Sequence, residues 1–184
     1  MFMMLALAQP ATRLSRERPH TTIFCAYALG SVAAQAASHL AFIFHAVRLA
    51  GSLEAASGAA ERLPDDDFEP GLVNSAAFLA SGALQLATFA VNYVGAPFST
   101  PLRQNTPLFA ALVLGYAALA LAASGAAPAL ERALELVPLP PPLRSALFAG
   151  AAADLAWSAL AEQGLRAALP ARASPAALRL SPGV

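Results

Sequence analysis

Residues 70–102 read PGLVNSAAFLASGALQLATFAVNYVGAPFSTPL and contain no Asp, Glu, Lys or Arg. Residues 19–47 and 104–130 are equally free of these charges, and residues 145–161 contain one charged residue, Asp154. A helix rises about 1.5 Å per residue, so about 20 apolar residues cross the roughly 30 Å hydrocarbon core of a bilayer. The four stretches predict an all-α, polytopic membrane helix bundle with four spanning helices, at residues 22–47, 72–94, 108–127 and 145–161.

The composition supports the membrane class and excludes several others. The chain has 184 residues, of which 58% are hydrophobic and 12% charged, whereas charged residues make up about 25% of an ordinary soluble domain. We therefore exclude a soluble enzyme. Cys25 is the only cysteine, which rules out an internal disulfide and a CxxC metal site. His39 and His45 point in different directions on a helix, so we predict no metal site.

Three regions follow from the hydropathy pattern. Residues 1–8 (MFMMLALA) are apolar but too short to span a bilayer, and we interpret them as the truncated end of a preceding helix. The first region, 1–21, is that helix end and a cytosolic linker, and the second, 22–161, is the four-helix transmembrane bundle. The third, 162–184, is rich in Pro and Ala towards its end and is expected to be a disordered cytosolic tail.

Arginine distribution predicts the orientation. The segment before the first span, the loop between the second and third, and the segment after the fourth hold seven of the eleven basic residues, all Arg: Arg13, Arg16, Arg18, Arg103, Arg166, Arg172 and Arg179. The loops on the other side hold four Arg and most of the acids, including the acidic loop at 65–69. Because basic loops stay in the cytosol, the N-terminal segment and the C-terminal tail are predicted to be cytosolic.

The second span carries a polar stripe. At 100° per residue, five hydrogen-bonding side chains fall within about 60° of one another on a helical wheel: Asn74, Ser81, Gln85, Thr88 and Asn92. The first span has a weaker stripe that includes Gln35 and His39. Such groups avoid lipid and face other helices or water. We expect the stripe to face the protein interior, against Gln35 and His39, either as interhelical hydrogen bonds or as the wall of a polar cavity.

Asp154 lies near the middle of the last predicted span. An ionised carboxylate there costs about 2.5–3.5 kcal/mol on insertion scales, so the group must be paired, protonated or in contact with water. It is either a structural hydrogen-bonding group or a functional ion site. The sequence contains no phosphate-binding loop and no nucleophile with a plausible base, so we predict no catalytic or cofactor-binding residue in this chain.

Several strings of residues resemble one family. They are LSRERP at 14–19, FEPGLVNS at 68–75, ATFAVNY at 87–93 followed by Gly95 and Pro97-Phe98, and NTPL at 105–108. In order and spacing they resemble the C-terminal membrane region of the type V, subtype A, P-type ATPases of the endoplasmic reticulum. The resemblance runs from about residue 14 to 165. It implies that the four spans are the seventh to tenth helices, with residues 1–8 as the end of the sixth.

The resemblance also implies a function for the larger protein. Full-length relatives use ATP and Mg²⁺, form an aspartyl-phosphate intermediate and remove misinserted transmembrane helices from the endoplasmic reticulum membrane. Their later helices act as support. The phosphorylation motif Asp-Lys-Thr-Gly-Thr and the cytosolic domains do not occur here, so we expect a fragment that is not catalytic alone. Its partners would be the lipid bilayer, the missing helices and domains, and, through the parent, transmembrane helix substrates; no nucleic acid is expected.

A second interpretation needs no parent protein. A freestanding four-span membrane scaffold, or a small ion or proton transporter subunit, has the same composition. Asp154 would then be the first candidate for the ion or proton site.

Overall fold

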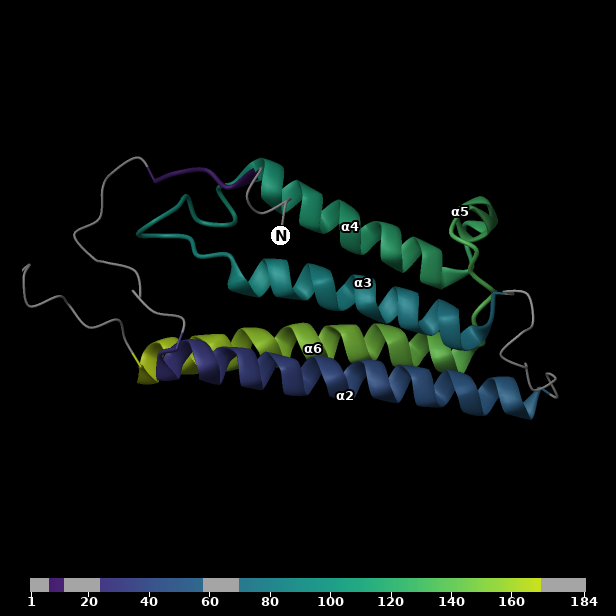
Figure 1. Cartoon of the computed structure of the whole chain (residues 1–184). Coiled ribbons are helices and arrows are strands. Elements are labelled where there is room, and N and C mark those ends of the chain that lie inside the picture. Colours follow the sequence, from purple (N-terminus) through teal and green to yellow (C-terminus); the bar gives the residue numbers. More distant parts are fainter. Residues whose placement is uncertain (1–6, 12–23, 58–69, 170–184) are drawn as a thin grey trace, which may run out of the picture.

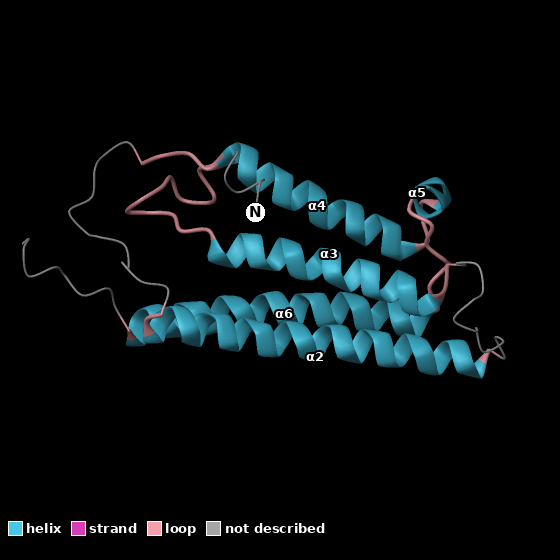
Figure 2. Cartoon of the chain, viewed as in Figure 1, coloured by secondary structure: helices cyan, strands magenta, loops and turns pink. Residues whose placement is uncertain are grey.

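The computed structural model describes residues 7–11, 24–57 and 70–169, and within them it is all-helical (Figures 1 and 2). Its helices are α2 (Ala26–Ala56), α3 (Leu72–Asn92), α4 (Thr106–Ser124), α5 (Pro128–Ala133) and α6 (Pro141–Ala168). By length and composition, α2, α3 and α4 can each cross a membrane. The predicted all-α membrane fold is confirmed at this level.

Three helices form the centre of the bundle. Helices α2, α3 and α6 pack against one another, and α4 packs mainly on the far side of α3. Figure 1 shows the four long helices side by side, with α5 across the end where α4 finishes and α6 begins. The direction of α2 is opposite to that of α3 and α6, so the N-terminal half of α2 lies beside the C-terminal half of α6.

Small residues allow these helices to approach closely. The buried face of α3 consists largely of alanines, namely Ala76, Ala80, Ala83 and Ala87. A Cβ atom placed on Gly150 of α6 would lie 2.3 Å from the ring of Phe42 on α2. Between lipid-facing helices the hydrophobic effect contributes little, so close packing of small residues is one of the main sources of association.

Residues 7–11 and the loop between α3 and α4 bind each other. The Asn105 amide caps α4 by accepting from the Leu108 N–H, and its Nδ2 donates to the Leu7 carbonyl at 2.7 Å. The Thr100 N–H donates to the Gln9 carbonyl at 3.0 Å. Pro107 enters the first turn of α4, where a missing backbone donor is harmless.

The helix boundaries differ most from the predicted ones at the C-terminal ends of α2 and α6. Helix α2 continues to Ala56, past Arg48 and Glu54, because long charged side chains at a helix end do not stop a helix. Helix α6 begins at Pro141 and ends at Ala168, so the boundary expected at residue 161 lies inside it.

The prediction of four spans is not confirmed. By length and hydropathy, three helices among the described residues qualify as spans, and α6 is not one of them. Its length of 28 residues is ample, but four charged residues interrupt its apolar sequence: Arg144, Asp154, Glu162 and Arg166. Residues 1–6, most of the predicted linker, the acidic loop at 65–69 and the tail from 170 onward lie outside the described residues.

Candidate functional site

Polar side chains from three helices meet along one half of the bundle. We call this group the polar seam; it comprises Tyr27, Ser31, Gln35, Ser38 and His39 of α2, Thr88 and Asn92 of α3, and Asp154, Ser158, Glu162 and Arg166 of α6. On α6 these residues recur every fourth position, and on α2 every third or fourth, so each set lies on one face of its helix.

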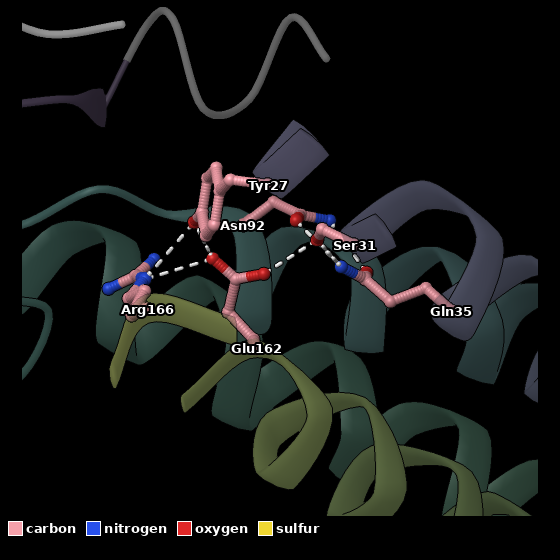
Figure 3. A network of polar contacts seen from close by, with 6 residues as sticks. All are labelled: Tyr27, Ser31, Gln35, Asn92, Glu162 and Arg166. Atoms are coloured by element: carbon pink, nitrogen blue, oxygen red, sulfur yellow. Dashed lines mark hydrogen bonds and ion pairs between the residues drawn. The ribbon is translucent and has the colours of Figure 1, made fainter. Parts of the chain in front are cut away.

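Glu162 organises the end of the seam that lies near the start of α2 (Figure 3). Its carboxylate accepts hydrogen bonds from the Tyr27 hydroxyl, from Ser31 Oγ at 2.6 Å and from Arg166 Nε at 2.9 Å. Glu162 is buried, whereas Arg166 is exposed. The carboxylate is thus balanced by a cation and by two hydroxyl groups, which compensates for its removal from water.

The network continues from Glu162 to α3. Gln35 Nε2 donates to Ser31 Oγ at 2.8 Å, while Ser31 donates to Glu162. Gln35 and Asn92 exchange two amide hydrogen bonds, of 3.0 Å from Gln35 Nε2 and 2.9 Å from Asn92 Nδ2. Figure 3 shows these side chains in one connected row. The three helices are therefore joined by a chain of hydrogen bonds in which each hydroxyl or amide both donates and accepts.

Asp154 forms the second part of the seam, further along α2. Its Oδ1 accepts from Ser38 Oγ at 2.6 Å and lies 2.8 Å from His39 Nδ1. The other ring nitrogen, His39 Nε2, lies 3.2 Å from Thr88 Oγ1. The His39 ring therefore connects α6 to α3, because one of its nitrogen atoms contacts Asp154 and the other contacts Thr88.

Thr88 also contacts its own helix, because its Oγ1 lies 2.9 Å from the Leu84 carbonyl. The contacts around His39 therefore place a basic ring beside a buried carboxyl group and a hydroxyl group. An acid and a base in direct contact compensate for each other's removal from water.

Three oxygen atoms near this pair are buried without a hydrogen-bond partner among the described residues. They are Asp154 Oδ2, Ser158 Oγ and Tyr116 Oη. Asp154 is 3% exposed and Ser158 is fully buried. Buried hydroxyl and carboxyl oxygens are normally hydrogen-bonded to protein or to ordered water. These three oxygen atoms could therefore each form a further hydrogen bond.

The structure brings together some of the residues that the sequence singled out. Gln35, His39, Thr88, Asn92 and Asp154 meet in the polar seam. The prediction that α3 presents its polar stripe to Gln35 and His39 is therefore confirmed for Thr88 and Asn92. It is wrong for Asn74, Ser81 and Gln85, which are exposed.

The reason for this difference lies on the opposite face of α3. The alanines from Ala76 to Ala87 point about 180° away from Asn74, and they form the contact with α2 and α6. Small side chains bring the helix backbones close together, which polar side chains of Gln or Asn size do not allow. The polar stripe can reach the seam near the C-terminal end of the helix, at Thr88 and Asn92.

Several polar residues of the interior were not predicted. Ser75, rather than its neighbour Asn74, is buried, and its Oγ accepts from the Val137 N–H at 3.0 Å. Ser158 and Glu162 were missed, although each follows Asp154 at four-residue spacing, which could have indicated one buried polar face. Glu162 had been assigned to the cytosolic tail because the helix was expected to end before it.

The chemistry of the seam is that of hydrogen bonding and proton sharing. Within residues 7–11, 24–57 and 70–169, no group of three or more His, Cys, Asp or Glu side chains is arranged to hold a metal ion. The hydrogen bonds of the seam join three helices, and its acidic members Asp154 and Glu162 each lie beside a basic side chain.

Comparison with known proteins identifies the family. No family model matches the chain. It is 38% identical over 175 residues to the "Probable manganese-transporting ATPase PDR2" of Arabidopsis thaliana, an alignment that covers 94% of this chain and 14% of the relative. It is 34% identical over 139 residues to the "Endoplasmic reticulum transmembrane helix translocase" of Saccharomyces cerevisiae, covering 75% of this chain and 11% of the relative. The protein of that name from Schizosaccharomyces pombe is 35% identical over 138 residues, which is 74% of this chain and 11% of the relative.

The chain thus spans about a tenth to a seventh of the length of these relatives, and most of it aligns with them. Its apolar helices show that the aligned portion is a multi-pass membrane region. The resemblance found in the sequence is confirmed: the chain belongs to the type V P-type ATPases and corresponds to a portion of their membrane region.

Proposed function

We propose that the chain is the C-terminal membrane support domain of an ATP-driven translocase that removes misinserted transmembrane helices from the endoplasmic reticulum membrane. The names of the fungal relatives support this activity and this organelle, and the Arabidopsis relative is named a probable manganese-transporting ATPase. ATP and Mg²⁺ would bind to other domains of the full-length protein. The partners of this chain would be those domains, the remaining membrane helices and the bilayer.

The polar seam is the observation that carries the support role. It joins α2, α3 and α6 by hydrogen bonds between buried and partly buried side chains, including the Gln35–Asn92 pair and the His39–Asp154 pair. A domain that moves little needs such connections, since buried polar networks that are satisfied rigidify a core. We propose that α6 is the fourth span, because its charged residues Asp154 and Glu162 are shielded from lipid by α2 and α3.

The exposed part of the α3 stripe supports membership in a larger bundle. Asn74, Ser81 and Gln85 lie on a helix that can cross the membrane, and they are exposed. Polar groups in a span normally face protein or a water-filled cavity. We propose that other membrane helices of the full-length protein cover this face. The N-terminal segment and the C-terminal tail would be cytosolic, as the arginine distribution predicts.

The test is made in the full-length protein that contains this region. Asn92→Leu should lower the yield of folded protein, while each folded molecule still forms the phosphoenzyme from ATP. Gln85→Leu should do the same if another helix covers the exposed stripe. Full loss of phosphoenzyme at normal folded yield would contradict a support role and would place the residue in the transport pathway.

A specific observation favours the second interpretation, a freestanding scaffold or a small ion or proton transporter subunit. Asp154 Oδ2 is buried without a partner among the described residues, as a proton- or ion-binding group would be before loading. The test is proton flux in liposomes that contain the 184-residue chain. Flux that disappears in Asp154→Asn would support a transporter, and the absence of flux in the unaltered chain would exclude one.

A further inference from the structure

A groove lies between α4 and α6, and its lining also includes Phe42 of α2 and Leu79 and Ala83 of α3. Its volume is about 310 Å³, and apolar side chains line it, among them Leu119 and Ala123 of α4 and Leu147 and Ala151 of α6. It forms because α4 packs on α3 and makes little contact with α6. The groove therefore runs along two helices and is bounded by apolar atoms.

Arg144 lies at the end of the groove where α4 finishes and α6 begins. It precedes Leu147 and Phe148 by about one turn, so it lies on the face of α6 that lines the groove. Its guanidinium reaches α4: a Cβ atom placed on Gly125, the residue that caps α4, would lie 3.0 Å from Arg144 Nη2. The cation thus bridges the two helices across the end of the groove.

The guanidinium of Arg144 does not use all of its N–H donors in hydrogen bonds within the protein. Nη2 donates to the Leu139 carbonyl at 3.2 Å, and Nε is buried without a hydrogen-bond partner in the part of the chain that the structure describes. In the same part of the chain, the ion pairs join Asp154 to His39 and Glu162 to Arg166, and Arg144 takes part in neither. A guanidinium offers five N–H donors in a planar fork that matches phosphate. An unpaired cation at the end of membrane helices is a typical site for a lipid headgroup.

We propose that this groove binds one phospholipid, with an acyl chain between α4 and α6 and the phosphate on Arg144. The inference rests on the proposal that α6 lies in the bilayer. The volume suits an acyl chain, since it is at the lower end of the range for small-molecule sites. A helix with a diameter of about 10–12 Å would not enter it. The apolar lining matches the chain, and the positive charge matches the headgroup.

The bound lipid would complete the packing of α4. At present α4 is attached through α3, where Leu119 lies against Gly82 and Leu86 lies against Gly115. An acyl chain along the groove adds contacts between α4 and α6, and a phosphate on Arg144 ties the end of α4 to the start of α6. The lipid therefore acts as a structural cofactor for the weakest part of the bundle.

The experiment uses the 184-residue chain, purified in detergent and stripped of lipid. Native mass spectrometry measures the retention of dioleoyl phosphatidic acid and of dioleoyl glycerol, which have the same acyl chains and differ in the phosphate. We expect one phosphatidic acid per chain, bound at least tenfold more tightly than dioleoyl glycerol. Equal retention of the two lipids would overturn the role of Arg144.

Matched variants separate the two halves of the site. Arg144→Gln should reduce phosphatidic acid retention about tenfold, whereas Arg132→Gln, an exposed arginine on α5, should not. Ala120→Phe fills the groove and should abolish retention, whereas Ala118→Phe, at an exposed position of α4 outside the groove, should not. Helical content and monodisperse elution are measured for each variant, and Ala151→Phe serves as a second groove-filling variant.

Each other outcome would contradict the proposal. Retention unchanged in both Arg144→Gln and Ala120→Phe would indicate lipid bound non-specifically around the protein. Competition by inorganic phosphate, with no effect of groove filling, would indicate a free anion site. No retention by the unaltered chain would overturn the proposal that the groove binds a phospholipid. None of these results changes the phosphoenzyme test, so this site and the proposed support function can fail independently.

Discussion

The two halves of the α2–α3–α6 bundle are held together in different ways. In the half that contains the polar seam, buried side chains such as Gln35, Asp154 and Glu162 are hydrogen-bonded between helices. In the other half, buried residues such as Ala46 and Ala80 have no polar atoms in their side chains. Because lipid is as apolar as leucine, hydrogen bonding and close packing are the main means of joining membrane helices. In this chain, hydrogen bonding joins the helices in the half with the polar seam, and close packing joins them in the other half.

Helix direction makes this division possible. The polar residues lie in the N-terminal half of α2 and in the C-terminal half of α6, which are side by side because the two helices are antiparallel. The apolar halves, with Phe42 to Ala50 on α2 and Leu143 to Gly150 on α6, are adjacent for the same reason.

The largest effect is expected from removing the central ionisable group. Asp154→Leu leaves the partly buried His39 ring and Ser38 hydroxyl without their buried partner, which should lower the free energy of unfolding by about 3–5 kcal/mol. The measurement is reversible unfolding in detergent micelles. Gln163→Leu, an exposed position on the same helix, is the control. An effect of Asp154→Leu no larger than that of the control would show that the seam contributes little.

In the half of the bundle that is joined by close packing, one added methyl group should lower the stability. Gly150→Ala places a Cβ atom 2.3 Å from the Phe42 ring, which should lower the free energy of unfolding by about 1–3 kcal/mol through overpacking. Gly164→Ala is the control, because no atom lies within 4 Å of a Cβ placed there. Combining Gly150→Ala with Phe42→Leu should restore part of the loss. A neutral Gly150→Ala variant would contradict the close approach of α2 and α6.

A smaller effect is expected for the amide pair between α2 and α3. A double-mutant cycle of Gln35→Leu and Asn92→Leu should give a coupling energy of about 0.6–1.7 kcal/mol, the range found for interhelical hydrogen bonds in membranes. The same cycle with Gln85→Leu in place of Asn92→Leu should give none, since Gln85 is exposed. A coupling energy between Gln35 and Gln85 would contradict this structure, because it would mean that α3 contacts α2 through its polar stripe.

The smallest effect is expected at the end of the seam. Arg166→Gln removes the ion pair with Glu162 but leaves the hydrogen bonds from Ser31 and Tyr27. Because the Arg166 side chain is 45% exposed, the loss in unfolding free energy should be about 0.2–1 kcal/mol and should shrink as salt is added. Arg103→Gln is a control at an exposed loop position. A loss that does not depend on salt would show that packing, rather than charge, holds Arg166.

The amino-acid sequence by itself determined the class of the protein and the approximate location of its helices. Charge-free stretches long enough to cross a bilayer leave few alternatives, because an exposed backbone is too costly in lipid. Short strings such as ATFAVNY also indicated the family, which the relatives confirm. The extra turns of α6 were not predictable from hydropathy, since Glu162 and Arg166 resemble a cytosolic tail until their partners on α2 are known.

The tertiary structure decided which polar residues lie inside. Asn74, Gln85 and Asn92 lie on the same face of α3 by spacing, yet Asn92 alone of these three meets a partner on α2. The choice depends on the alanines of the opposite face, which set how closely and at what angle α3 approaches α2 and α6. Spacing places residues on a face of one helix, but the partner of that face is determined by packing between helices.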